Sequence, residues 1–239
     1  MMMLFEDYFN CGEIIYGYND EVKHTENGDV VSEIQLQKLR QQWAVIREKY
    51  VKEVNLVPIQ LQATNSSNHG SQSTMVVPIG VGDAGPEKGR GLFATEPIPK
   101  GTLVVNLDNG STGIFKQGHS WREFVVSLPR ETACNFIEWS WVQTIPPSSN
   151  NEIDDDNDIR TGLTIFVAFD ESNLLNSADW DGIDANVRCG SAPMHEGEKR
   201  GPCRFHYYAA RDIAAGDELL INYGEFEDLS QQGWTDIGL

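Results

Sequence analysis

The stretch AARDIAAGDELLINYG, residues 209–224, has a partial copy far upstream, ATEPIPKGTLV, residues 94–104. Each copy has the pattern of a strand, an I-x-x-G turn and a second strand, in which isoleucine fills the core and glycine takes a positive φ. Two such hairpins predict two related corners of one folded β unit, because a solenoid would need more copies. The matching pairs share an offset of 115 (209 − 94) and are Ala94 with Ala209, Ile98 with Ile213, and Gly101 with Gly216.

Upstream of the first copy, residues 32–54 have a helical pattern and residues 62–74 are a polar stretch without periodicity. Ser32 and Gln35 form a capping box at the expected helix start. The apolar stripe predicts packing on the main domain, and the alternative is a homodimer seam. The stripe consists of Leu36, Leu39, Trp43, Ile46 and Tyr50.

After residue 74, short runs rich in Val, Ile, Phe and Tyr alternate with Gly and Pro, and these runs predict strands. The segment 120–142 is expected to be partly helical, and the acidic segment 148–158 a solvated loop. The fold class is therefore mainly β with accessory helices. The expected domains are an accessory region at 1–74, a main domain at 75–224 and a C-terminal segment at 225–239.

The composition of the 239 residues is that of a globular protein, with 40% hydrophobic residues and a net charge of −18. The charge argues against direct nucleic-acid binding and is compatible with a basic partner. No apolar run reaches membrane-spanning length, and a secretory signal is not expected. Four cysteines without a C-x-x-C pair predict free thiols in a reducing compartment. Zinc is a disfavoured alternative, with Cys189, His195, Cys203 and His206 as the only candidate ligands.

Three ordered motifs resemble those of the SET domain, across roughly residues 75–224. GRGLFA at 89–94, followed by IPKG, resembles the opening motif of that family. NLLN at 173–176 lies where the family has R-F-x-N, and the later DAN resembles its P-N. ARDIAAGDEL at 210–219, running on to Tyr223 and Gly224, resembles the closing motif. The chain departs from the family by having Ser177 in place of the motif histidine, four extra residues before Asn186, and no Cys-rich zinc tail.

The resemblance implies a SET-domain (β-clip) fold of small sheets with a C-terminal pseudoknot, which is held by Asn186 and Glu218. It implies S-adenosyl-L-methionine as the cofactor, no metal, and a lysine that enters by a narrow channel from the opposite side. Tyr223 is the implied catalytic residue, and Ile221, Tyr223 and Trp234 line the implied channel. The implied cofactor-binding residues are Lys88, Gly89, Arg90, Gly91, Leu92, Asn176, Ser177 and Trp234.

The chemistry of methyl transfer to an amine fits these residue types. The reaction requires alignment, a neutral amine and exclusion of water, and a dry aromatic channel lowers the pKa of a lysine through desolvation. The phenol of Tyr223 can orient the reactants without carrying a full charge. Taken alone, a tyrosine on a strand is more simply read as a core residue, and the flanking motifs reverse that preference.

The sequence therefore predicts a protein lysine methyltransferase whose leading substrate is a histone tail, and hence a nuclear protein. One alternative is a methyltransferase for a non-histone protein. A second is a SET-like binding module that has lost catalysis, which the missing histidine favours. A third is a β-clip domain outside this family that binds a sugar or another small molecule.

Overall fold

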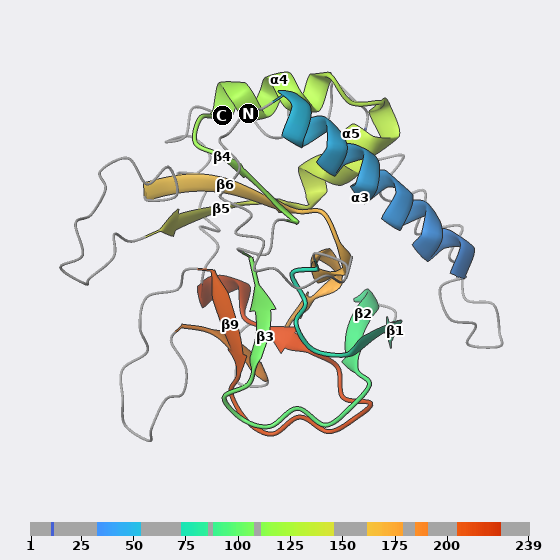
Figure 1. The fold of residues 1–239 in the computed structure, drawn as a ribbon, viewed down its shortest axis with the longest axis vertical. Helices are drawn as coiled ribbons and strands as arrows, with labels where there is room; N and C mark the ends of the chain where they lie inside the picture. Colours follow the sequence, from blue (N-terminus) through green and yellow to red (C-terminus); the bar gives the residue numbers. More distant parts are fainter. Residues whose placement is uncertain are drawn as a thin grey trace, which may run out of the picture. The chain divides into compact units, whose positions relative to one another are not determined.

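The computed structural model describes residues 11, 33–53, 73–85, 88–107, 111–145, 162–178, 185–190 and 205–225 (Figure 1). The chain divides into two compact units. Met1–Gln42, Ile114–Val167 and Glu227–Leu239 form the first unit, and Trp43–Gly113 and Ala168–Phe226 form the second. The domain boundary expected near residue 75 stays a prediction.

The second unit is built from small sheets. β1 and β2 form an antiparallel pair, β9 lies between β3 and β8 in an antiparallel sheet, and β7 pairs with β10 in parallel. These strands are β1 (Ile79–Gly85), β2 (Gly89–Ala94), β3 (Leu103–Asn106), β7 (Asn176–Ser177), β8 (Val187–Cys189), β9 (His206–Ala209) and β10 (Leu220–Ile221), with the 3-10 turns η1 (Glu171–Leu174) and η2 (Tyr223–Glu225). The mainly β fold class is confirmed.

The two copies of the repeated stretch pair with each other, as Figure 1 shows for the green and orange-red segments that run side by side. Ile98 N donates to Ile213 O and Ile213 N donates to Ile98 O, both at 2.9 Å. The two side chains are 3% and 2% exposed, so both belong to the core. The prediction of two related corners in one β unit is confirmed.

The reciprocity extends to the turns of both copies. Gly101 N donates to Ala209 O at 2.7 Å, and Gly216 N donates to Ala94 O at the same distance. The φ angles of the two glycines are 83° and 91°, in the region that favours glycine. The expected backbone role of each glycine is therefore confirmed. We call this paired arrangement of residues 94–102 and 209–217 the clip.

The first unit combines two helices with most of a three-stranded sheet in which β6 lies between β4 and β5. Packed rings of Phe115, Trp121, Phe124 and Phe136 form its core. The expectation of partly helical structure in segment 120–142 is confirmed. The elements are β4 (Thr112–Phe115), α4 (Gly118–Val126), α5 (Arg130–Glu138), β5 (Ser140–Ile145) and β6 (Gly162–Ala168).

Helix α3 (Glu33–Glu53) has nearly the bounds that its periodicity predicts. Leu36, Trp43 and Ile46 of the predicted stripe are at most 7% exposed. The predicted capping box lies outside the residues whose side chains are described. The dimer seam stays a prediction. No helix in the described ranges combines the length and apolarity needed to cross a membrane.

The prediction of free thiols is wrong. Cys11 and Cys134 form a disulfide with a Cα–Cα distance of 5.3 Å, and both side chains have no exposed surface. Cys189 is also disulfide-bonded, and its partner lies outside the described residues. The sequence does not reveal the first pairing because 123 residues separate the two cysteines and only the fold brings them together. A bonded Cys189 also has no thiolate to offer as a metal ligand.

Two expected strands have different bounds. The run that begins at Met75 becomes a strand only at Ile79, directly after Pro78, which has no N–H to donate to a ladder. In the run 218–224, Glu218 makes an isolated β-bridge with Phe93, and the strand itself is confined to Leu220–Ile221. Tyr223 therefore begins the turn η2 and does not lie on a strand.

Candidate active site

The β1–β2 hairpin carries the predicted glycine loop. Gly85 and Gly89 have φ angles of 97° and 68°, and Asp83 Oδ1 accepts a hydrogen bond from Gly85 N at 2.8 Å. A Cβ atom at Gly89 would find no heavy atom within 4 Å, so the backbone there is open to an approaching group. Gly91 differs, because a Cβ there would lie 2.6 Å from Glu218 Oε1. Gly91 thus allows close packing inside the protein.

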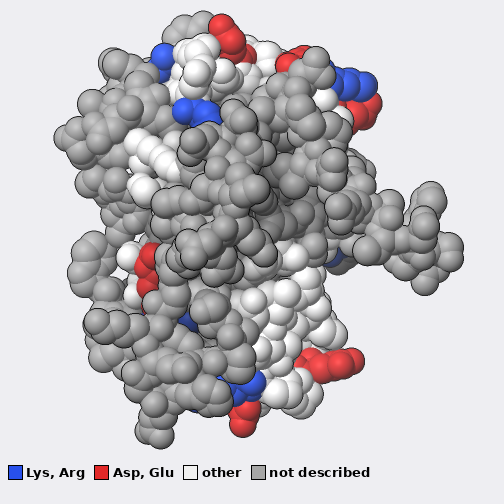
Figure 2. Space-filling model, turned by 60° about the vertical axis from the view of Figure 1, so that its left-hand side comes forward, with Lys and Arg blue, Asp and Glu red and all other residues white. Residues whose placement is uncertain are grey.

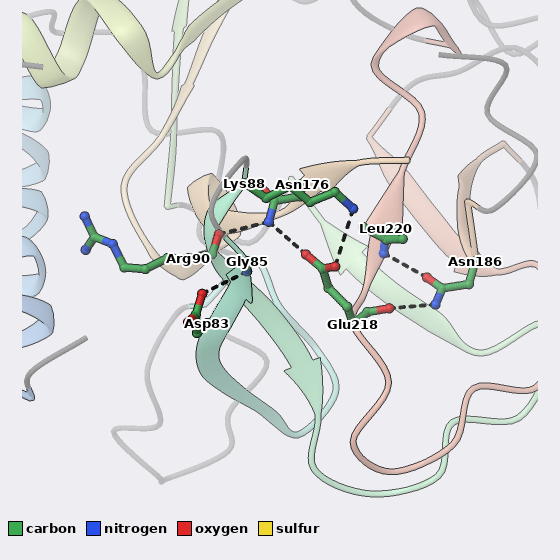
Figure 3. Close-up of polar contacts among 8 residues, drawn as sticks. All are labelled: Asp83, Gly85, Lys88, Arg90, Asn176, Asn186, Glu218 and Leu220. Atoms are coloured by element: carbon green, nitrogen blue, oxygen red, sulfur yellow. Dashed lines mark hydrogen bonds and ion pairs between the residues drawn. The ribbon is translucent and has the colours of Figure 1, made fainter. Parts of the chain in front are cut away.

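A polar network joins this hairpin to β7 and to the closing motif (Figure 3). Asn176 Nδ2 donates to Arg90 O at 2.9 Å and to Glu218 Oε1 at 2.8 Å, while Lys88 Nζ lies 3.6 Å from Glu218 Oε2. Figure 3 shows the Arg90 side chain pointing away from Glu218, so Arg90 joins the network through its carbonyl. The network brings together residues that are far apart in the sequence.

Asn186 fixes the crossing of the closing motif. Its N–H donates to Leu220 O at 3.0 Å, its Oδ1 accepts from Leu220 N at 2.9 Å, and its Nδ2 donates to Glu218 O at 2.8 Å. On the other side, β10 pairs with β7, and Ala178 N donates to Ile221 O at 2.7 Å. The closing motif therefore lies between two earlier segments, as the pseudoknot implies.

A buried carboxylate positions the approach to β7. Asp170 is 6% exposed and accepts hydrogen bonds from Thr74 N at 2.6 Å, Thr74 Oγ1 at 2.8 Å and Ser172 N at 3.0 Å. These bonds cap η1, which leads directly into β7. The Asp170 carboxylate, which accepts these several hydrogen bonds, thus fixes the backbone that leads into β7, beside Tyr223.

Tyr223 lies at the junction of these elements. Its hydroxyl donates to Leu175 O at 2.8 Å, and its N–H donates to Ser177 Oγ at 3.4 Å. Its side chain is half-buried, so it is not a core tyrosine. A phenol that donates its proton still has lone pairs to accept contacts. The turn follows from Asn222, whose Oδ1 accepts from Gly224 N and whose carbonyl accepts from Glu225 N, both at 3.0 Å.

The other predicted site residues have different surroundings. The Leu92 side chain has no exposed surface, and Leu92 O accepts from Leu219 N at 2.7 Å. Ile221 is 7% exposed, and Ser177 is half-buried. Trp234 lies outside the described residues. Within the described ranges, no group of three or more His, Cys, Asp or Glu residues is placed to hold a metal ion.

An ion pair that no sequence motif indicates lies next to Tyr223. Arg188 Nη1 lies 2.6 Å from Glu225 Oε1, and the side chains are 23% and 18% exposed. Tyr207 is buried nearby, and its burial raises the pKa of its phenol, which the negative charge of Glu225 raises further. No local pattern links these residues, because 37 positions separate Arg188 from Glu225.

A search of curated proteins finds no match to the chain. Among solved structures, the chain is similar to Polycomb Repressive Complex 2 of Chaetomium thermophilum bound to S-adenosylmethionine, with 21% identity, a TM-score of 0.38, and coverage of 67% of this chain and 17% of that one. It is also similar to the Neurospora SET domain protein DIM-5, a histone lysine methyltransferase, with 14% identity, a TM-score of 0.36, and coverage of 63% and 53%. The methyltransferase domain of human SETMAR gives 17% identity, a TM-score of 0.36, and coverage of 62% and 45%. The chain thus spans about a sixth of the length of the Polycomb chain.

The family comparison covers the region that contains the clip, the polar network and Tyr223. The family model of the SET domain matches residues 89–224, which is more than half of the 239 residues. The match begins at Gly89, the first residue of β2, and ends directly after Tyr223. The chain belongs to the SET domain family.

Proposed function

We propose that this chain is an S-adenosylmethionine-dependent protein lysine methyltransferase. The observation that carries the proposal is the half-buried Tyr223 hydroxyl, held 2.8 Å from Leu175 O at the end of the closing motif. Two oxygen atoms fixed this close together can hold a methyl group by weak C–H···O contacts. Membership of the SET domain family supports the same activity.

S-adenosylmethionine is the cofactor of SET methyltransferases. When bound, it supplies a methyl group on a positively charged sulfur. The open backbone at Gly89 fits the close approach of such a group, since no heavy atom of the described residues beyond its chain neighbours would lie within 4 Å of a Cβ there. Lys88 would supply positive charge for a carboxylate and Ser177 would offer its backbone, whereas the Arg90 side chain points away from the network. The amide of Asn176 is already engaged with Arg90 O and Glu218, so its part is to hold the hairpin in place.

The residues of this chain would act by orientation. A lysine has a pKa of about 10.4, so losing its proton at pH 7 costs about 4–5 kcal/mol in water. Burial in a dry channel lowers this cost because it disfavours the charged amine. The Tyr223 oxygen would then hold the amine in line with the methyl group, and alignment of this kind contributes roughly 7–11 kcal/mol.

The proposed substrate is a lysine of a histone tail, which implies a nuclear location. The net charge of −18 supports a basic substrate because it attracts one over long range. On the face drawn in Figure 2, the Lys and Arg side chains of the described residues lie in small separate groups, several beside Asp or Glu. A basic tail could add to a sheet edge as an extended strand.

A specific observation favours a second candidate, a basic protein other than a histone. Cys11 and Cys134 form a disulfide, and Cys189 is also disulfide-bonded. Disulfides persist in oxidising compartments and are rare in nuclear proteins. Both candidates share the same site and the same chemistry. The two candidates differ in the cellular compartment of the protein. Labelling of free thiols in intact cells would test this, because it shows whether the cysteines are reduced or disulfide-bonded there.

The experiment compares the wild type with Tyr223→Phe. Single-turnover methylation of mixed core histones and of other basic proteins is measured with labelled S-adenosylmethionine, and cofactor affinity is measured by calorimetry. Loss of a positioning contact made in the transition state typically lowers the rate by roughly 100- to 1,000-fold. We expect a loss of that size with cofactor affinity unchanged.

Tyr50→Phe is the matched control because Tyr50 is a half-buried tyrosine of α3, outside the candidate site. Its rate should equal that of the wild type. Equal rates for Tyr223→Phe and wild type would reject the catalytic role of Tyr223. A wild type that binds the cofactor but methylates nothing would favour the binding-module alternative.

A further inference from the structure

The turn that carries Tyr223 is short and is fastened at both ends. At its start, the Tyr223 hydroxyl and N–H bond to Leu175 O and Ser177 Oγ. At its end, Glu225 forms the ion pair with Arg188 of β8 at 2.6 Å. Because η2 spans only Tyr223–Glu225, a movement of Glu225 would be passed directly to the tyrosine.

β8 is a fixed support for this ion pair. Arg188 pairs with Tyr208 in the register of β8 and β9, between the pairs Val187–Ala209 and Cys189–Tyr207. The residue before β8 is Asn186, whose side chain binds the closing motif at Leu220 N and Glu218 O. The strand is therefore held by the sheet on one side and by the crossing on the other.

The surroundings of the pair make it sensitive to the loss of one partner. Both side chains are less than a quarter exposed, so water screens their attraction less than it does on the surface. The Glu225 carboxylate also lies close enough to the buried Tyr207 phenol for its negative charge to add to the rise in the pKa of that phenol, which burial mainly causes. Without Arg188, the carboxylate would face a neutral buried phenol and would gain free energy by turning toward water.

We propose that Arg188 and Glu225 are positioning residues that set the place of the Tyr223 hydroxyl through η2. The expected effect on kcat rests on the proposed function. The expected effect on the position of the Tyr223 hydroxyl rests on the ion pair alone. Neither residue needs to touch the substrate or the cofactor. A misplacement of about 1 Å in a catalytic group costs up to about 100-fold in rate.

The test is a double-mutant cycle of Arg188→Met and Glu225→Gln in the full chain. We expect each single variant to lower kcat by about ten- to a hundredfold, with cofactor affinity changed less than threefold. The double variant should be no worse than the worse single variant, because the two residues act as one unit. Arg188→Lys keeps the charge and should retain more activity than Arg188→Met.

Glu48 and Lys52 provide the matched control pair. They also lie 2.6 Å apart, but both side chains are 68% exposed and their pair joins neighbouring turns of α3. Glu48→Gln, Lys52→Met and their combination should leave kcat unchanged. The proposal would be overturned if the kcat losses of the two single variants multiplied in the double variant. It would also be overturned if the wild type were active and the single variants kept its kcat.

A second readout does not depend on activity. In protein labelled with 13C-tyrosine, the ring signal of Tyr223 is assigned by its absence in Tyr223→Phe. The signal should shift or broaden in Arg188→Met and Glu225→Gln and stay in place in Glu48→Gln. A wild type without methyl transfer would reject the proposed function alone, whereas an unmoved Tyr223 signal would reject the positioning role in either case.

Discussion

Gly91 is a residue where packing leaves no room for a side chain. A Cβ atom there would lie 2.6 Å from Glu218 Oε1 and 3.0 Å from both Asn176 Nδ2 and Ala84 Cβ. The family resemblance gives the glycine a role in approaching the cofactor. The structure gives it a second role, because its missing side chain lets Glu218 and Asn176 meet.

Gly91→Ala should therefore destabilise the protein and disturb the network. Overpacking of this kind typically costs about 1–3 kcal/mol. Denaturant unfolding measures the loss, and Gly80→Ala is the control because its Cβ would meet only the Thr95 Cγ2 methyl, at 3.3 Å. If Gly91→Ala were as stable as Gly80→Ala, the close packing around Glu218 would not be required.

At the scale of elements, a turn glycine of the clip, Gly216, is required for its backbone conformation and not for the space around it. Gly216 has a φ of 91°, and a Cβ there would have no heavy atom within 4 Å. Replacement by alanine therefore introduces strain without a clash. The strain of a non-glycine residue in this region is about 1–2 kcal/mol.

We expect Gly216→Ala to lower the free energy of unfolding by that amount and Gly216→Asn by less, since asparagine tolerates a positive φ. Thermal and denaturant unfolding of the two variants measure the difference. Equal stability of Gly216→Ala and the wild type would show that the turn relaxes to a negative φ.

The elements differ in how well the sequence predicts them. The helix at 33–53 follows from a local periodicity, and the clip follows from the repeat, because both signals lie within short stretches of sequence. The sequence pattern does not locate strand ends where a single residue decides them, as with Pro78 and with the turn at Asn222. The network around Asn176 follows from the sequence only in part, since only the family motifs indicate Glu218 and Asn186. The Arg188–Glu225 pair and the Cys11–Cys134 bond depend on tertiary proximity, which no local pattern encodes.

At the scale of the whole molecule, the Cys11–Cys134 disulfide closes a loop across 123 positions. Cross-links that close long loops typically contribute about 2–4 kcal/mol. We expect the Cys11→Ser/Cys134→Ser variant to lose that much stability, which corresponds to roughly 4–16 °C in Tm for a chain of this size.

Peptide mapping under non-reducing conditions provides the direct check, with the wild type compared before and after reduction. A peptide that joins the segments around Cys11 and Cys134 is the expected product. Alkylation of both residues in unreduced, unfolded protein would contradict the bond.

The charge of the molecule makes a separate prediction. With a net charge of −18, attraction to a lysine-rich peptide should weaken as salt shortens the Debye length from about 10 Å at 0.1 M to 3 Å at 1 M. KM for such a peptide should rise with salt while cofactor affinity changes little. A KM that is independent of salt would remove the charge argument for a basic substrate.

The clip also has a consequence for synthesis on the ribosome. Ile98 pairs with Ile213, 115 positions later (213 − 98), and Gly101 pairs with Ala209, 108 positions later (209 − 101). The first arm therefore leaves the ribosome long before the second exists. At about 5–20 residues per second, the wait is roughly 6–23 s. Throughout this interval the first arm presents unpaired backbone groups, and the second unit can close only after residues 209–217 have been made.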